Sequence, residues 1–234
     1  MLDRMRRNPA NAHLGLMLAL TFSTGIIDAV GYLGLDRVFT GNMTGNVVIL
    51  GMGLAGDTGL PIVGPLIALG GFMAGAALGG RALRGSADAW TPRHTVLFGA
   101  VGVVIALAAV PASLLEHEGT ALQYAITLAL GAAMGCQAAA ARHVAVKDVT
   151  TVVVTSTITG LASDSVLGKG GGQPWKRRAG AIALISLGAL TGALLLKLHI
   201  GAGMALSAII TLVVAWLGQV SHPSRLARLP YDQD

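Results

Sequence analysis

The stretch Val38-Phe39-Thr40-Gly41-Asn42-Met43-Thr44-Gly45-Asn46 lies between two long apolar runs of this 234-residue chain. Its two Thr-Gly steps and two Asn disfavour an uninterrupted helix, because Gly costs about 1 kcal/mol relative to Ala there and Asn competes for backbone hydrogen bonds. The apolar residues that follow, Val47 to Ala55, supply only about half of the roughly 20 residues that cross a bilayer. Broken backbone at membrane depth is tolerated only where protein or a water-filled cavity satisfies its polar groups. The stretch therefore predicts a re-entrant segment, an extended limb followed by a half-helix, beside a pathway or binding site.

Composition indicates an integral membrane protein. Hydrophobic residues make up 53% of the chain and charged residues 12%, against about 25% charged in soluble domains. The apolar runs supply about six to eight crossings, in a single membrane domain covering residues 1–234. The first run, Leu14 to Leu35, has no small-residue cleavage site at its end and is expected to remain as a helix. The one cysteine, Cys136, provides neither a disulfide framework nor a multi-cysteine metal site, and no cofactor is expected.

Basic residues decide the expected topology, because Lys and Arg accumulate on the cytoplasmic side of membrane proteins. One arrangement puts all of the 16 Lys and Arg inside except Arg37 and Lys197. It assigns to the cytoplasm both termini and residues 81–93, 142–148 and 168–178. This holds only if residues 38–57 and 149–167 each enter and leave on one side. We therefore expect six spanning helices, two re-entrant segments and both termini in the cytoplasm.

The expected topology contains a repeat. Residues 40–45 align with residues 155–160 at an offset of 115, and Gly71-x-x-x-Gly75 aligns with Gly188-x-x-x-Gly192 at an offset of 117. Repeat 1 covers about residues 14–113 and repeat 2 about residues 121–220. Each has three crossings, an odd number, so the second copy is expected to be inverted. Inverted 3+3 repeats are found in transporters whose site lies near the midplane at discontinuous helices.

Several short motifs also resemble a known family. They are Gly25-x-x-Asp28-x-x-Gly31, the residues Phe39 to Asn46, Ala133-Met134-Gly135-x-Gln137 and Thr157-Ile158-Thr159-Gly160. Together they resemble the YoaK-like family of bacterial inner-membrane proteins, over nearly the whole chain, and the Met-Thr-Gly-Asn motif is the most specific part. The resemblance implies a six-helix membrane protein without an assigned function, for which transport is the expected activity. It leaves the solute open.

Asp28 is the only acidic residue inside a full-length apolar run. An acid in hydrocarbon costs several kcal/mol, so Asp28 is expected to face the bundle interior. Two roles are open at this point. Asp28 relays a proton or cation, or it accepts hydrogen bonds from exposed N–H groups of the re-entrant segment and holds that segment in place. Both roles put Asp28 against residues 40–46.

The other predicted pathway residues carry hydroxyl or amide groups: Thr40, Asn42, Thr44, Asn46, Gln137, Thr155, Thr157 and Thr159. Asn42, Thr44 and Asn46 are expected to line a pore at the start of the short helix, whose N–H groups offer partial positive charge. In the alternative, Thr44 is only an N-cap and the Asn side chains satisfy free carbonyls. The later Thr residues line the pathway or bond their own backbone. Gln137 bonds either a re-entrant segment or a neighbouring helix.

Two glycine-rich faces have the small-x-x-x-small spacing that lets helices approach closely. They are formed by Gly71, Gly75 and Gly79, and by Gly188 and Gly192. The spacing fits internal packing against the re-entrant segments, and it also fits the seam of a homodimer. Both interpretations remain open at this stage.

Charged and metal-ligating side chains lie mostly at the ends of the predicted helices. Those with imidazole groups, His94, His117, His143 and His199, have no spacing that suits a metal. Asp164 is expected to be solvated or paired with Lys169. The basic run 176–178 fits a cytoplasmic anchor near anionic lipid better than a nucleic-acid site. The expected partners are therefore the lipid bilayer and a small polar or ionic solute.

Two function classes follow. The first is a small-solute transporter or channel, with a midplane site where two opposed broken helices meet. The alternative is a non-transporting scaffold or sensor in which Asp28 and the Asn residues only stabilise those breaks. A wet cavity would make a Cys at Asn46 reactive toward water-soluble thiol reagents, whereas a scaffold would protect it. A membrane-embedded enzyme is not expected, because no nucleophile with a base and no His/Asp cluster has suitable spacing.

Overall fold

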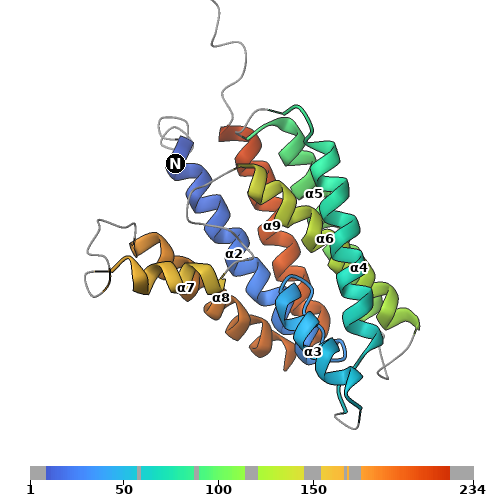
Figure 1. Ribbon diagram of the computed structural model, residues 1–234. Helices are drawn as coiled ribbons and strands as arrows, with labels where there is room; N and C mark the ends of the chain where they lie inside the picture. The colour runs from blue at the N-terminus through green and yellow to red at the C-terminus, as the bar shows by residue number, and fades with distance from the viewer. Residues whose placement is uncertain are drawn as a thin grey trace, which may run out of the picture.

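The computed structural model describes residues 9–56, 59–86, 90–113, 121–144, 154–165, 168 and 175–221. Within these ranges the chain forms helices and no strand (Figure 1). The helices are α2 (Pro9–Gly34), α3 (Met43–Leu54), α4 (Val63–Ala82), α5 (Pro92–Ala112), α6 (Ala121–Val144), α7 (Val154–Ser163), α8 (Trp175–Leu196) and α9 (Ile200–Ser221). The predicted all-α class is therefore confirmed.

Six helices of the described chain are long and apolar enough to cross a bilayer: α2, α4, α5, α6, α8 and α9. The other two, α3 and α7, have 12 and 10 residues. At 1.5 Å per residue they extend about 18 and 15 Å, well short of a hydrocarbon core of about 30 Å. They coincide with the two predicted breaks, although α3 begins at Met43, four residues before the expected start. Most of the extended limb expected before α7 lies outside the described residues.

The spanning helices pack in pairs through glycines. On α4, Gly71 and Gly75 lie against the backbone of α6. On α8, Gly188 and Gly192 lie against the backbone of α2. Both pairs run parallel, because higher residue numbers on one helix meet higher numbers on its partner. The glycine faces thus pack inside the protein, as expected, but the expectation that they pack against the short segments is wrong: a helix without a Cβ at these positions fits best against another long, regular helix.

The helix α2 lies at the centre of the bundle and contacts α8, α9 and α6. In its most apolar window 67% of the residues are buried, compared with 17% for α8. Figure 1 shows α7 and α8 together on one flank of α2, with the other long helices on the opposite flank. Since protein rather than lipid surrounds α2, it can carry buried polar side chains. Ser23, for example, lies 2.8 Å from the hydroxyl of Ser207 on α9.

The segment between α2 and α4 starts and finishes at the same end of the bundle. After α2, Asp36 and Arg37 adopt left-handed backbone conformations with φ of 53° each, and the chain turns back along α2. Where the segment finishes, Gly64 at the start of α4 lies within 2.6 Å of Val38, measured from its ideal Cβ position to Cγ2. Arg37 donates to the carbonyl of Gly59 at 3.3 Å. Between these ends, α3 packs against α4.

Candidate functional site

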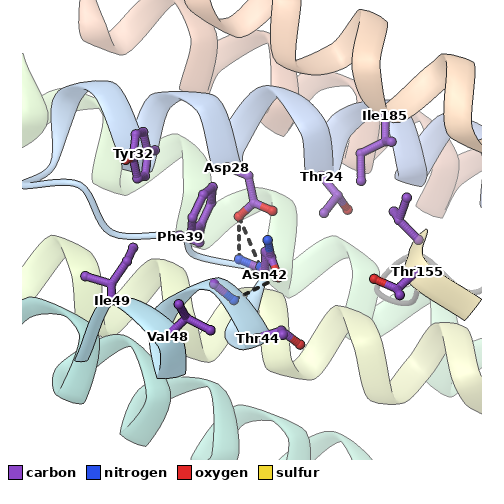
Figure 2. A pocket seen from close by; sticks show the side chains of 13 residues that line it. Thr24, Asp28, Tyr32, Phe39, Asn42, Thr44, Val48, Ile49, Thr155 and Ile185 are labelled. Carbon is purple, nitrogen blue, oxygen red and sulfur yellow. Dashed lines mark hydrogen bonds between the residues drawn. The ribbon is translucent and has the colours of Figure 1, made fainter. Parts of the chain in front are cut away.

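Asp28 binds the backbone of the turned-back segment. Its Oδ1 accepts hydrogen bonds from the backbone N–H groups of Thr40 at 3.0 Å, Gly41 at 2.6 Å and Asn42 at 3.4 Å. The Thr40 hydroxyl donates to the same atom at 3.4 Å. These contacts, drawn in part in Figure 2, give the extended backbone partners that hydrocarbon could not provide. The structure therefore places Asp28 against the segment, as both predicted roles require.

Asn46 holds Phe39, the residue before Thr40 in the same segment. Its Oδ1 accepts from the Phe39 N–H at 2.9 Å, and its Nδ2 donates to the Phe39 carbonyl at 2.6 Å. The side chain is 1% exposed, so it satisfies a free carbonyl instead of lining a cavity. The N-cap of α3 is Asn42, whose Oδ1 accepts from the Gly45 N–H at 3.2 Å. The proposed cap at Thr44 is wrong, because the helix begins one residue before Thr44.

Two glycines permit the close approach of this segment. A Cβ on Gly31 would lie 2.5 Å from the Val38 carbonyl oxygen. A Cβ on Gly45 would lie 2.6 Å from the Phe39 ring. Both distances are far below normal van der Waals contact for carbon, so only glycine lets the limb fold back along α2 and against α3.

A cavity of about 530 Å³ lies beside Asp28. Its polar lining comes from α2 and from the first residues of both short helices: Thr24, Asp28, Asn42, Thr44 and Thr155. Figure 2 shows Thr44 of α3 and Thr155 of α7 directed toward the space between them. Tyr32 and Phe39 add aromatic surface, with ring centroids 4.8 Å apart in a stacked arrangement. The volume suits a small solute, since ligand sites are usually about 300–1,000 Å³.

A second cavity, of about 500 Å³, lies between α2 and α8. It shares Asp28, Tyr32, Phe39 and Ile185 with the first cavity. These four side chains therefore separate the two spaces, and Asp28 contributes to the surface of both.

The predicted site residues divide into two groups. Asp28, Asn42, Thr44 and Thr155 line the first cavity. The others do not: Thr40, Asn46 and Gln137 are buried, and Thr157 and Thr159 lie further along α7. Thr159 donates to the backbone carbonyl of Thr155 at 3.0 Å, as its alternative interpretation predicted.

Sequence reasoning missed Thr24 and Tyr32 as lining residues. They lie four positions before and after Asp28, on the same face of α2. That spacing was the available signal, because residues at i−4 and i+4 are the neighbours of Asp28 on its face of the helix.

Gln137 does not line the cavity but contacts Thr24, a residue that does. Its Nε2 donates to the Thr24 hydroxyl at 3.1 Å, so its partner is a neighbouring helix rather than a short segment. Its buried Oε1 has no hydrogen-bond partner among the described residues. An unsatisfied buried acceptor costs about 1–3 kcal/mol, which makes this amide an unusual feature of the core.

Among the described residues, no group of three or more His, Cys, Asp or Glu could hold a metal ion.

Comparisons with known proteins agree with this architecture. Residues 16–217 match a family described as "Protein of unknown function (DUF1275)". The UPF0700 transmembrane protein YoaK of Bacillus subtilis (strain 168) is 31% identical over 153 residues, which are 64% of this chain and 65% of that protein. The match thus covers slightly less than two thirds of this curated relative. No solved structure matches the chain. Since the family match spans most of the chain, this multi-pass membrane protein belongs to the DUF1275 family and is similar to YoaK.

Proposed function

We propose that this protein is a transporter or channel for a small solute, and that the cavity beside Asp28 is its binding site. One observation carries the proposal: the first residues of both short helices line a single cavity together with a buried carboxylate. Ionisable groups inside membrane proteins are costly and usually mark solute or proton pathways. Discontinuous helices that meet at such a group are typical of transporter sites.

The proposal includes two re-entrant segments. For the first segment, the support is that Val38 and Gly64 lie together at one end of the bundle, whereas Gly41 reaches back to Asp28 inside α2. For the second, the support is the short length of α7 and the position of Thr155 on the same cavity. Irregular backbone at this depth is tolerated where it lines a cavity.

The proposal also includes an inverted repeat, which the glycine contacts support. Three contacts between α2 and α8 recur between α6 and α4, with an offset of 106 from α2 to α6 and of 117 from α4 to α8. The matched contacts are Gly25–Ile185 with Gly131–Ala68, Gly188–Phe22 with Gly71–Leu128, and Gly192–Ile26 with Gly75–Ala132. A constant register over three contacts fits two copies of one packing unit.

The directions of α2 and α6 support the inversion. His13, near the start of α2, stacks with Trp90 at 6.0 Å, and Trp90 is near His94 at the start of α5. His94 lies 3.2 Å from His143 at the end of α6. The start of α2 and the end of α6 therefore lie at the same end of the bundle, so these two helices run in opposite directions.

We assign the end of the bundle that holds the start of α2 to the cytoplasm of a bacterial inner membrane. Arg81, Arg93 and Arg142 lie at this end, whereas Arg37 and Lys197 lie at the other. Because Lys and Arg concentrate in cytoplasmic loops, this distribution favours cytoplasmic termini.

Thiol accessibility tests whether the cavity is wet. Asn46 is a poor probe position, because its side chain is buried and bonded to Phe39. Asn42→Cys and Thr44→Cys, in a Cys136→Ala background, place the thiol in the cavity lining instead. In intact proteoliposomes both should react with a charged, water-soluble methanethiosulfonate. Val103→Cys, in the middle of α5 and facing outward, should stay protected, and Lys197→Cys at the bundle end should react.

A scaffold or sensor is the second candidate. The observation that favours it is the set of hydrogen bonds by which Asp28 and Asn46 hold the segment. These bonds stabilise the fold whether or not a solute passes. If the thiols at positions 42 and 44 are as protected as the thiol at position 103, the scaffold is the better description and transport through this cavity is excluded.

A further inference from the structure

We propose that the solute is a small cation with N–H donors, of the amine or guanidinium class, and that its charged group binds the free side of Asp28. This inference rests on the proposed transport function and names the chemistry of its solute. The carboxylate, its neighbouring rings and the hydroxyls on the opposite wall carry the argument.

The charged side chains of the lining disfavour an anion. Asp28 lines both cavities, and no Lys, Arg or His is among the described residues that line either of them. An anion in this space would lie beside a carboxylate without a nearby cationic side chain, in surroundings where water screens the repulsion weakly. A cation at the same place neutralises the carboxylate.

The hydrogen bonds of Asp28 leave one oxygen for a solute. All four hydrogen bonds that Thr40, Gly41 and Asn42 donate to Asp28 converge on Oδ1. No described residue donates to Oδ2, although the side chain is only 8% exposed. Figure 2 shows this second oxygen without a dashed contact. A nearly buried carboxylate oxygen without a donor is complementary to an ammonium or guanidinium N–H group.

The aromatic pair beside Asp28 fits a cation as well. Tyr32 and Phe39 stack at 4.8 Å and line both cavities together with Asp28. The negative face of an aromatic ring attracts cations within about 6 Å, and aromatic surfaces recognise ammonium groups in this way. A carboxylate beside two stacked rings therefore provides charge and π surface to the same group.

The two hydroxyls opposite Asp28 offer further acceptors. Thr44 and Thr155 line the cavity, one from each short helix, and neither hydroxyl makes a hydrogen bond to another described residue. A solute with several N–H groups has donors both for Oδ2 and for hydroxyls of this kind. A quaternary ammonium, which lacks N–H donors, cannot.

The helix N-termini do not reverse this preference. A helix N-terminus is equivalent to about half a positive charge, and those of α3 and α7 lie at the cavity. For α3, however, the Asn42 N–H already donates to Asp28 and the Gly45 N–H to the Asn42 side chain. Counted together, the two N-termini at most balance the carboxylate, so they do not give the cavity the net positive charge that would favour an anion.

Counterflow exchange tests the solute class whatever the coupling mechanism. Proteoliposomes of the full chain are preloaded with an unlabelled probe and mixed with the same probe carrying ¹⁴C. The probes are guanidinium, methylammonium, tetramethylammonium, acetate and glycerol. Guanidinium and methylammonium should exchange at least tenfold faster than in protein-free liposomes, and the other three probes should exchange no faster than in protein-free liposomes.

Variants tie the exchange to Asp28. Asp28→Asn keeps an oxygen for the Gly41 N–H but removes the charge, and it should lower guanidinium exchange at least tenfold. Tyr32→Leu, which leaves the backbone contacts of Asp28 intact, should lower it several-fold and provides the test if Asp28→Asn fails to fold. Asp36→Asn removes the same charge outside the lining of both cavities, at a turn whose left-handed backbone Asn also adopts, and it should change exchange less than twofold.

The outcomes separate this inference from the proposed function. Exchange of acetate or glycerol, but not of guanidinium, above the rate in protein-free liposomes overturns the cationic class and leaves transport standing. Exchange of tetramethylammonium as fast as methylammonium overturns the requirement for N–H donors. If the folded protein exchanges none of the five probes, both the inference and transport through this cavity by small solutes are overturned.

Discussion

The backbone N–H of Gly41 donates a 2.6 Å hydrogen bond to Oδ1 of Asp28, thirteen residues earlier in the chain. This bond connects the irregular segment to the most buried spanning helix. Because Oδ1 also serves Thr40 and Asn42, one side chain sets the depth to which the segment enters the bundle. The other oxygen of the same carboxylate remains available to the cavity, so structure and proposed function use different atoms of Asp28.

Asp28→Ala should therefore destabilise the protein strongly. It removes the acceptor of three backbone N–H groups, and each buried donor left without a partner costs about 1–3 kcal/mol. We expect a loss of about 3 kcal/mol overall, because water entering the enlarged cavity will satisfy part of the demand. Asp28→Asn should lose about 1 kcal/mol, since it retains one acceptor oxygen. Thermal unfolding in detergent measures both losses, and an unchanged midpoint for Asp28→Ala would contradict the structural role.

Asn46→Ala should be more damaging than Asn42→Ala. The first change leaves both backbone groups of Phe39 without partners in a buried site, at a cost of about 2 kcal/mol or more. The second removes an exposed N-cap bond to Gly45, worth about 1 kcal/mol. Hydrogen exchange at residues 39–46 should increase more for Asn46→Ala. Equal effects would show that the two hydrogen bonds between Asn46 and Phe39 stabilise the segment no more than the N-cap bond of Asn42 does.

Gly75→Ala should disrupt the pair formed by α4 and α6. Its new Cβ would overlap the carbonyl oxygen of Ala132, a backbone atom that cannot move away without shifting the helix. Overpacking of this kind costs about 1–3 kcal/mol or more. Gly70→Ala is the matched control on the same helix, because nothing lies within 4 Å of its Cβ position. It should be neutral or more stable, by up to about 1 kcal/mol from helix propensity.

If the proposed repeat is correct, Gly192→Ala in the second copy should resemble Gly75→Ala in the first. Gly192→Ala brings a Cβ to 2.5 Å from the Ile26 carbonyl oxygen, in the contact that matches Gly75–Ala132. It should therefore be destabilising to a similar degree, with Gly180→Ala as its open control. A Gly192→Ala protein as stable as wild type would remove the energetic support for two equivalent packing units.

Hydropathy predicted the six long apolar helices because the bilayer itself imposes their length. Helix length follows from bilayer thickness, and helices α3 and α7 differ visibly from that length. The partner of each glycine face could not be predicted, since spacing shows that some backbone approaches Gly75 but not which one. The cap was misplaced for a similar reason. Asn42 and Thr44 are both good N-caps, and only the bond of Asp28 to the backbone of residues 40–42 decides where α3 begins.

Arg178 should control the attachment of α7. Its Nη1 donates to the Gly160 carbonyl at 2.6 Å and to Asp164 Oδ2 at 2.8 Å. These contacts join the end of α7 to the start of α8. Asp164 is thus paired with Arg178, and its expected partner Lys169 lies outside the described residues. No residue of α7 is fully buried, so this attachment replaces much of the packing that other helices obtain from the core.

Arg178→Ala should therefore accelerate hydrogen exchange in residues 154–163 and leave residues 43–54 unchanged. The global loss should stay below about 1 kcal/mol, because the Asp164 side chain is 36% exposed and solvent screens such pairs. Arg178→Lys retains the charge on a shorter side chain, which is less able to reach both oxygens, so its exchange should be intermediate. Lys176→Ala is the control for a lost charge on the same turn of α8. If exchange rises equally in α3 and α7, the change destabilises the whole bundle and the local attachment is wrong.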